Sequence, residues 1–142
     1  WMTTLNDRAA AAMLAASAHS ATDITGYGLL GHAAEMARAS QVALHIDGSS
    51  VPLLPGVLDL IDREIIPGGS KENAELHAQF TAFSADVPAS LRIALSDAQT
   101  SGGLLISLAP ENLDTLRHNM QGERTLCTVI GEVREGEGIT VW

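Results

Sequence analysis

Residues 22–32 of the chain read Thr-Asp-Ile-Thr-Gly-Tyr-Gly-Leu-Leu-Gly-His, and we call this stretch the first glycine segment. Residues 96–105 read Ser-Asp-Ala-Gln-Thr-Ser-Gly-Gly-Leu-Leu and form the second glycine segment. Each places an aspartate two or three residues before a threonine, followed by glycines and an apolar stretch. Glycine lets the backbone approach a ligand closely and adopt a positive φ, and the free N–H groups at a helix start attract anions. Both segments are therefore candidate binding turns.

The two aspartates, Asp23 and Asp97, indicate the kind of ligand. A carboxylate repels a phosphate but can reach it through a divalent cation, because Mg²⁺ takes one or two carboxylates together with phosphate oxygens. A structural alternative stays open for each residue. Asp23 could cap the helix that follows it, and Asp97 could close an Asx-turn before a strand. Spacing alone does not decide between these interpretations.

The composition excludes several classes of protein. The 142 residues include 8 Lys and Arg against 17 Asp and Glu, a formal net charge of −9. This acidity argues against a nucleic-acid surface, which needs clustered basic residues. The single Cys127 excludes a disulfide framework or a multi-cysteine zinc site. No apolar run comes near the roughly 20 residues of a membrane span, and residues 1–4 lack the basic and apolar regions of a secretory signal. We therefore expect a cytoplasmic protein with no membrane or nucleic-acid partner.

Helical and strand patterns mix along the chain. We expect helices at residues 5–18, 29–39, 57–66 and 88–96, and after Pro110. We expect strands at residues 42–46, 103–108, 125–133 and 139–142, and the apolar run at 103–108 predicts a buried strand. Residues 19–27 are predicted to form a polar turn, and Pro67-Gly68-Gly69 is predicted to end a helix. Residues 72–79 fit either a helix or a loop before a strand near residues 80–83. The mixture predicts an α/β (α+β) layered sandwich, a mixed β-sheet flanked by helices, in one domain covering residues 1–142.

Gly26-x-Gly28-x-x-Gly31 also matches the fingerprint of dinucleotide-binding folds, with a helix after it and Asp47 behind the next strand. That fold needs a buried parallel strand directly before the glycines. Residues 16–25 do not have the pattern of such a strand. The dinucleotide fold is therefore disfavoured, while a stand-alone nucleotide-binding module stays open as an alternative.

Four blocks of the sequence resemble the C-terminal half of the selenophosphate synthetases (selenide, water dikinases), a family related to AIR synthetase. The blocks are residues 22–32, Val-Pro-Leu-Leu-Pro-Gly at 51–56, Pro-Gly-Gly at 67–69 with Asn73, and residues 97–105. They occur in the order and spacing of that family, and the resemblance runs from about Met2 to Val141. From the residues alone, Asn73 fits either a cap or a ligand contact.

The resemblance implies a fold and an activity. The fold is the AIR-synthetase-like C-terminal domain, and the whole enzyme converts ATP, selenide and water to selenophosphate, AMP and phosphate with Mg²⁺. A metal-binding aspartate of that family lies in the Thr-Asp-x-Thr-Gly block, so Asp23 takes the role of metal ligand. We assign the nucleotide contacts to residues of the two glycine segments: Thr22, Thr25, Gly26, Gly28, Asp97, Thr100 and Gly102.

The resemblance also implies what else the enzyme needs. The catalytic cysteine or selenocysteine of the family and its lysine lie in an N-terminal segment not found in this sequence, and neither Cys127 nor Lys71 matches that motif. We therefore assign no catalytic residue and expect the chain alone to be inactive. The expected partners are the absent N-terminal ATP-binding domain of the same enzyme, ATP and selenide, with the parent enzyme a homodimer. A structural or dimerisation domain and a related AIR-synthetase-like enzyme stay open as alternatives.

Overall fold

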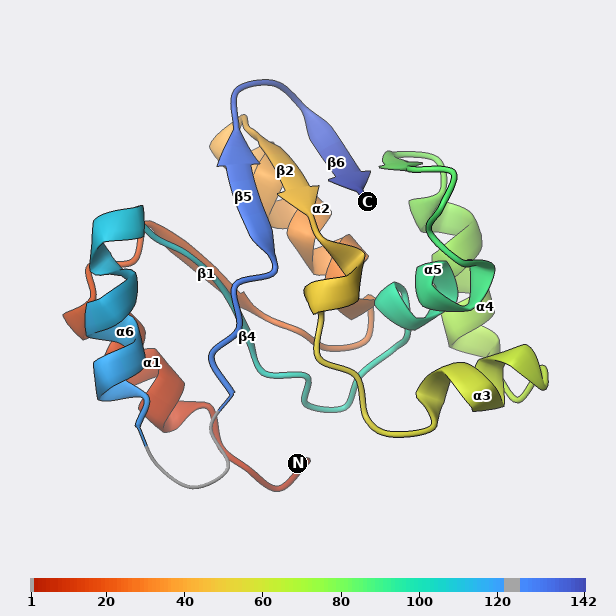
Figure 1. Ribbon diagram of the computed structural model, residues 1–142, viewed down its shortest axis with the longest axis horizontal. Helices are drawn as coiled ribbons and strands as arrows, with labels where there is room; N and C mark the ends of the chain where they lie inside the picture. Colours follow the sequence, from red (N-terminus) through yellow and green to blue (C-terminus); the bar gives the residue numbers. More distant parts are fainter. Residues whose placement is uncertain (1, 122–125) are drawn as a thin grey trace.

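The computed structural model describes residues 2–121 and 126–142 (Figure 1). The α-helices are α1 (Asp7–Ala15), α2 (Gly28–Ser40), α3 (Val57–Asp62), α4 (Gly68–His77), α5 (Ala89–Leu95) and α6 (Leu113–Asn119). The strands are β1 (Ser20–Asp23), β2 (Ala43–Ile46), β3 (Thr81–Phe83), β4 (Leu104–Ser107), β5 (Gly131–Arg134) and β6 (Gly138–Val141). Two short 3-10 helices, η1 (Gly48–Ser50) and η2 (Pro110–Asn112), lie between them. Every helix in the described residues is too short or too polar to traverse a lipid bilayer.

Two sheets organise the described residues. Strands β1 and β4 form an antiparallel ribbon in which Asp23 pairs with Leu104. The other strands form a mixed sheet in the order β3-β6-β2-β5. In that sheet β6 is parallel to both β2 and β3, whereas β5 is antiparallel to β2. A mixed sheet with flanking helices confirms the predicted fold class.

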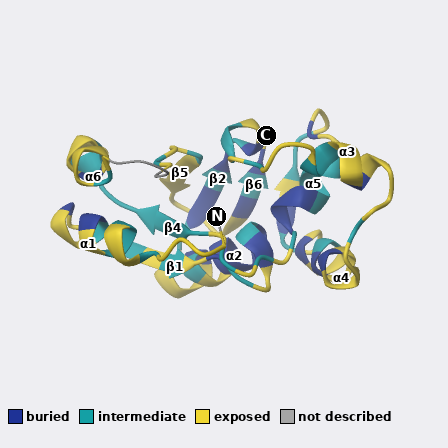
Figure 2. Ribbon diagram, turned by 90° about the horizontal axis from the view of Figure 1, so that it is seen from below, coloured by how far each residue is buried: buried dark blue, intermediate teal, exposed yellow. Residues whose placement is uncertain are grey.

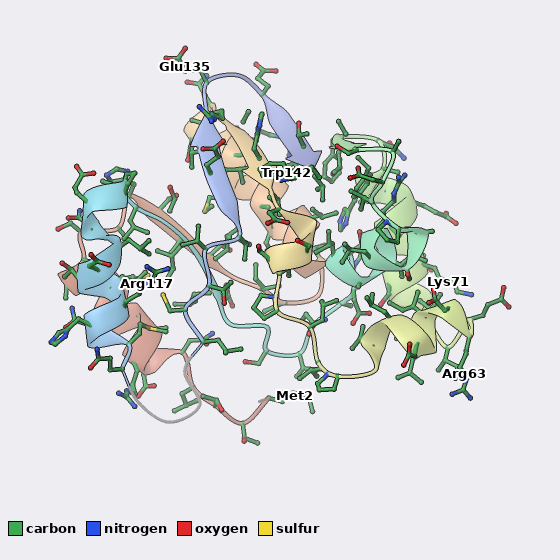
Figure 3. The ribbon with its side chains drawn as sticks, viewed as in Figure 1. Met2, Arg63, Lys71, Arg117, Glu135 and Trp142 are labelled. Carbon is green, nitrogen blue, oxygen red and sulfur yellow. The ribbon has the colours of Figure 1, made fainter. Side chains whose placement is uncertain are left out.

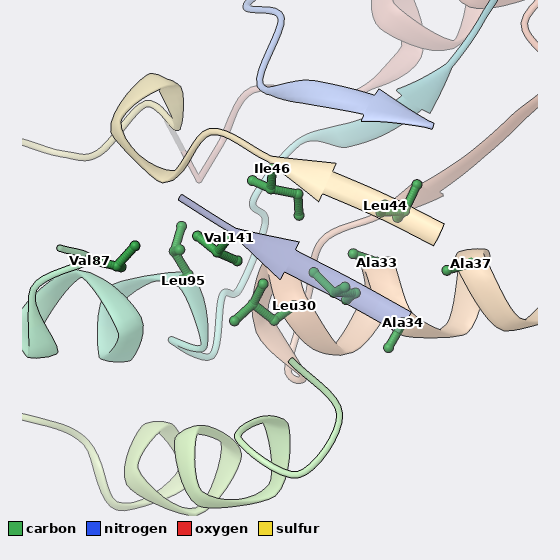
Figure 4. Close-up of a cluster of buried hydrophobic side chains, with 10 residues drawn as sticks. Leu30, Ala33, Ala34, Ala37, Leu44, Ile46, Val87, Leu95 and Val141 are labelled. Carbon is green, nitrogen blue, oxygen red and sulfur yellow. The ribbon is translucent and has the colours of Figure 1, made fainter. Parts of the chain in front are cut away.

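Helix α2 forms the main core together with the mixed sheet. Its buried face carries leucine and alanine at helical spacing, and the small alanines let the helix lie close to the strands. The buried members of the cluster are Leu30, Ala33, Ala34, Ala37, Leu44, Ile46, Val87, Leu95, Ile139 and Val141. Figure 4 shows them gathered where α2, α5, β2 and β6 meet. Each fully buried leucine contributes about 1.5–3 kcal/mol to folding, so this cluster anchors the helix that follows the first glycine segment.

A smaller cluster lies to one side of the sheet, where α1 and α6 pack together (Figures 1 and 2). Ala12, Ala16 and Leu116 are buried there, and Ile106 of β4 packs against them. The alanine-rich segment forms α1 as predicted, because alanine loses no side-chain entropy in a helix. Since β1 leads from α1 to α2, and β4 leads toward α6, the ribbon connects the two clusters.

The prediction that residues 19–27 form only a polar turn was wrong, because residues 20–23 pair with β4 as strand β1. Half-buried and exposed residues alternate along β1, and its mostly polar side chains gave no apolar signal. The pairing is antiparallel, so β1 is not the parallel strand that a dinucleotide fold requires. Asp47 caps η1 instead: the hydroxyls of Ser50 and Ser49 donate to its carboxylate and hold the pKa of Asp47 below its usual value.

Pro67-Gly68-Gly69 begins a helix rather than ending one. Helix α3 ends at Asp62, where Arg63 follows as its C-cap, and Pro67 is the N-cap residue of α4. Proline suits this position because the first N–H groups of a helix have no partner within the helix. The alternative left open for residues 72–79 is thereby decided in favour of helix, followed by β3.

Two strands differ from their predictions, one in its burial and the other in its extent. β4 is half-buried along its length rather than buried, because among the residues that the structure describes it pairs only with β1, in a two-stranded ribbon. Of the predicted strand at residues 125–133, only Gly131–Arg134 forms β5, and residue 125 lies outside the described residues. Cys127 is half-buried and precedes the strand.

The short connection between β5 and β6 does not join neighbouring strands. β2 lies between them, and Ala43 pairs with Arg134 on one side and Gly138 on the other. Residues 135–137 therefore cross the beginning of β2, as Figure 1 shows at the upper edge of the sheet. β6 becomes an inner strand of the sheet by this crossing.

Candidate functional site

The structure brings the two glycine segments together, although they are far apart in the sequence. Past the end of the β1–β4 ribbon the pairing continues: Ile24 N–H donates to the Gly103 carbonyl at 2.9 Å, and Gly102 N–H donates to the Ile24 carbonyl at 2.8 Å. Gln99 N–H then donates to the Thr25 carbonyl at 3.0 Å. The candidate residues of both segments therefore share one end of the ribbon.

Gly28 provides the closest approach between the segments. Its φ is +65°, and a Cβ atom placed on it would lie 2.6 Å from the Ser96 carbonyl carbon and 2.7 Å from the oxygen. Its N–H donates to the Thr25 carbonyl at 3.0 Å. Only glycine fits this backbone geometry without strain. The start of α2 is consequently packed directly onto the backbone of the second glycine segment.

Helix α4 holds both segments through polar side chains. The Asn73 amide donates to the Gly26 carbonyl at 2.9 Å and to the Ser96 carbonyl at 3.1 Å. The Ser70 hydroxyl donates to the Asp97 carboxylate and accepts from Ala98 N–H at 3.3 Å. His77 Nδ1 lies 3.0 Å from the Ser96 hydroxyl oxygen. The buried residues of α4 are all polar: Ser70, Asn73 and His77.

Ser70 and His77 were not identified from the sequence as site residues. A signal for them was present, because residues 70, 73 and 77 follow the i, i+3, i+7 spacing of one helix face. A polar face at that spacing is ordinarily interpreted as solvent-exposed. Here that face is buried against the second glycine segment, and Asn73 joins the two glycine segments rather than capping a helix.

The two aspartates have different surroundings. Both carboxylate oxygens of the half-buried Asp97 accept hydrogen bonds, one from Ser70 and the other from Gln99 Nε2 at 2.9 Å. Asp23 is exposed at the end of β1, and in the part of the chain that the structure describes no hydrogen bond or ion pair reaches its carboxylate. The Asp23 side chain is therefore open to a ligand, whereas Asp97 already has protein partners.

The remaining candidates surround this end of the ribbon. Thr22 is half-buried in β1, and its hydroxyl donates to the Asp23 carbonyl at 3.3 Å. Gly102 packs against Ile24, and a Cβ atom placed on Gly102 would lie 2.9 Å from the Ile24 carbonyl oxygen. Gly26 and Thr100 are exposed. Lys71, labelled in Figure 3, is exposed on the first turn of α4, next to buried Ser70.

The donor set fits part of a magnesium site. Among the described residues no three His, Cys, Asp or Glu side chains gather in a way that could hold a metal ion. Mg²⁺ does not need such a cage, since it binds one or two carboxylates and completes its shell with phosphate oxygens and water. One open carboxylate at Asp23 therefore suits a magnesium ion whose other ligands come from a nucleotide or a partner.

Comparison with known proteins gives a family match over nearly the whole chain. Residues 2–142 match the family described as "AIR synthase related protein, C-terminal domain". The chain belongs to this family. The match confirms the resemblance and the AIR-synthetase-like fold expected from the sequence.

Two similar curated proteins are named selenide, water dikinase. The selenide, water dikinase of Citrifermentans bemidjiense is 40% identical over 99% of this chain, and that of Pelobacter propionicus is 42% identical over 94%. The chain spans only 40% and 39% of those two proteins. Among solved structures, thiamine-monophosphate kinase from Stenotrophomonas maltophilia superposes with a TM-score of 0.58 at 23% identity. That match covers 87% of this chain and 31% of the kinase, and it shows a shared fold.

Replacing Gly28 tests the packing of this AIR synthase related domain. Gly28→Ala should lower the free energy of unfolding by about 2–4 kcal/mol, because the methyl group meets the Ser96 backbone at a strained φ. Gly26→Ala is the matched control, since a Cβ there meets nothing within 4 Å. Urea denaturation of the three proteins measures the difference. Equal losses in both variants would contradict the close approach.

The pH dependence of stability tests the burial of His77. Burial, and secondarily the nearby His32, holds the pKa of His77 below its usual value. The unfolded chain therefore binds this proton more readily, so the stabilisation is complete above about pH 6.5 and is lost as the pH falls below it. His77→Gln should flatten this decline in urea denaturation between about pH 7.5 and about pH 5.

His118→Gln is the control for this measurement, because His118 is exposed on α6. It should keep the decline of the unmodified chain. If His77→Gln declined as steeply as the unmodified chain, His77 would not be the group responsible.

Proposed function

We propose that this chain is the C-terminal domain of a selenide, water dikinase and contributes one wall of its Mg²⁺–ATP site. The observation that carries the proposal is the open carboxylate of Asp23 at the end of β1, beside the turn that leads into α2. Curated relatives about 40% identical over nearly the whole chain carry that name. The enzyme's reaction would convert ATP, selenide and water to selenophosphate, AMP and phosphate.

The charge of the chain supports a metal-dependent role. With a net charge of −9 the chain repels a free polyphosphate, and a divalent cation between the two would offset that repulsion. Phosphoryl transfer depends mainly on positioning and electrostatic stabilisation. A wall with a metal ligand and a rigid turn would therefore help to position the phosphates and to stabilise their charge. When bound, Mg²⁺ would neutralise phosphate charge, and Asp23 would hold it.

The nucleotide contacts that we propose are the residues assigned from the sequence. Thr22, Thr25, Gly26, Gly28, Thr100 and Gly102 lie around the Asp23 end of the ribbon or pack the turn there. Asp97 would act from its hydrogen-bonded position beside Ser70. Further ATP contacts and selenide chemistry would come from an N-terminal domain, in a homodimeric cytoplasmic enzyme. The greater length of the relatives supports a partner domain of this kind.

Substitution of Asp23 in the full-length enzyme tests the proposal. Asp23→Asn should lower Mg²⁺-dependent ATP consumption by roughly 100-fold, because it removes the charge that holds the cation. The unfolding midpoint should stay nearly the same, since the side chain is exposed and unpartnered in the described residues. Asp114→Asn, on the exposed surface of α6, is the matched control and should retain activity. An Asp23→Asn enzyme of normal activity would remove Asp23 from the site.

The 142-residue chain on its own should consume no ATP and form no selenophosphate, because one open carboxylate supplies only part of a magnesium shell. To measure this, the purified chain is incubated with ATP, Mg²⁺ and selenide, and the release of AMP and phosphate is followed. The full-length enzyme under the same conditions is the positive control. Turnover by the chain alone would mean that it contains a complete site, contrary to the proposal.

A further inference from the structure

A buried serine of α4 closes a small hydrogen-bonded ring with the second glycine segment. The Ser70 hydroxyl donates to one carboxylate oxygen of Asp97 and accepts from Ala98 N–H, with 3.3 Å between the nitrogen and the hydroxyl oxygen. Ser70 is completely buried, with an exposed fraction of 0%. One hydroxyl group therefore holds both the side chain of Asp97 and the backbone that follows it, and it attaches the start of the segment to α4.

The other carboxylate oxygen of Asp97 continues this network toward the first glycine segment. Gln99 Nε2 donates to that oxygen at 2.9 Å and also lies 3.3 Å from the Asp97 carbonyl oxygen. The backbone N–H of the same glutamine donates to the Thr25 carbonyl at 3.0 Å. The Asp97 carboxylate is therefore the middle member of a connection that begins at α4 and ends at the residue contacting the first glycine segment.

The side-chain partners of Asp97 are neutral groups. A serine hydroxyl and a glutamine amide donate to it, and none of the ion pairs within the described residues includes this carboxylate. Because a serine hydroxyl accepts as well as donates, the amide nitrogen in Asp97→Asn can donate to Ser70 while the amide oxygen accepts from Gln99. The network therefore requires a planar polar side chain at position 97 but does not require its negative charge.

We propose that Asp97 and Ser70 are positioning residues, which fix the turn at residues 97–99 between α4 and the first glycine segment, and that Asp97 binds neither the nucleotide nor its cation. This inference rests on the proposed function and changes the role assigned to Asp97 there, which was a nucleotide contact. The turn leads directly to Thr100 and Gly102, the other proposed contacts of the second segment. A misplacement of about 1 Å in positioning groups can lower a rate about 100-fold, so a fixed turn is important for ATP binding.

Urea denaturation of the 142-residue chain tests the connection without any activity measurement. Ser70→Ala and Asp97→Ala each remove the hydrogen bond between the two side chains, so the midpoint shift of the double variant should be smaller than the sum of the two single shifts. Ser70→Ala combined with Asp114→Ala is the matched control, in which the shifts should add. Asp114 is exposed on α6, and α6 and α4 lie at opposite ends of the molecule (Figures 1 and 2). Additive shifts for Ser70 and Asp97 would overturn the inference.

The ATP requirement of the full-length enzyme tests the functional consequence. Asp97→Ala removes both hydrogen bonds of the carboxylate, so the KM for ATP at saturating Mg²⁺ should rise about tenfold. Ser70→Ala should raise this KM in the same direction. The half-saturating Mg²⁺ concentration should stay the same in both variants, because neither residue would bind the cation.

Asp97→Asn separates a positioning residue from a charged ligand. It keeps the size of the side chain and both of its hydrogen bonds, so the KM for ATP and the half-saturating Mg²⁺ concentration should stay within about twofold of the unmodified enzyme. Loss of packing alone would not predict the difference between the asparagine and alanine variants. If Asp97→Asn raised either quantity as far as Asp97→Ala raises the KM, the charge would be required and the inference would be overturned.

Comparison with Asp23→Asn distinguishes a failure of this inference from a failure of the proposed function. If Asp23→Asn and Asp97→Asn are both inactive, the proposed function stands and the positioning role of Asp97 falls. If Asp23→Asn is fully active, the proposed function falls, and the role of Asp97 in ATP binding falls with it. An inactive Asp23→Asn enzyme, a normal Asp97→Asn enzyme and a raised KM for ATP in Asp97→Ala together support both.

Discussion

The hydrogen bonds of one buried amide determine how the candidate site is assembled. Asn73 donates to the carbonyls of Gly26 and Ser96, so one side chain joins the two glycine segments to α4. A buried carbonyl left without a partner costs about 1–3 kcal/mol, which makes this bridge hard to replace. The neighbouring Ser70 contacts the same second segment. Because directional hydrogen bonds, rather than apolar contacts, dock α4, its position on the two segments is defined closely.

The two glycine segments look alike in sequence but differ in what the fold does with their aspartates. The Asp97 carboxylate faces α4 and is occupied by Ser70 and Gln99. The Asp23 carboxylate, at the end of β1, is exposed and has no hydrogen bond or ion pair with the residues that the structure describes. The same residue type therefore makes internal hydrogen bonds in one segment and has an open carboxylate in the other. Helix α4 contributes to this difference through Ser70, which donates to Asp97.

The sequence predicted the fold class and most elements because apolar periodicity is strong in α2 and β2. It failed where polar residues are ordered by distant partners. β1 has no apolar pattern and exists only through its pairing with β4, and Gly68 begins a helix whose buried face is polar. For the site, both segments were found from their glycines and aspartates. Their contact depends on tertiary packing, and the spacing of Ser70, Asn73 and His77 indicates one helix face without indicating that this face is buried.

The crossing of residues 135–137 over β2 has a consequence for how the chain reaches its native state. β6 fills the gap between β2 and β3, and both of those strands precede it by a long stretch of sequence. Until β6 is in place, β2 and β3 have no strand between them. During synthesis the sheet therefore cannot be completed before β6 has been made. Contacts between residues so distant in sequence also form slowly. Before β6 is in place, the unpaired edges of β2 and β3 are exposed. Association with other incompletely folded chains would begin at these edges.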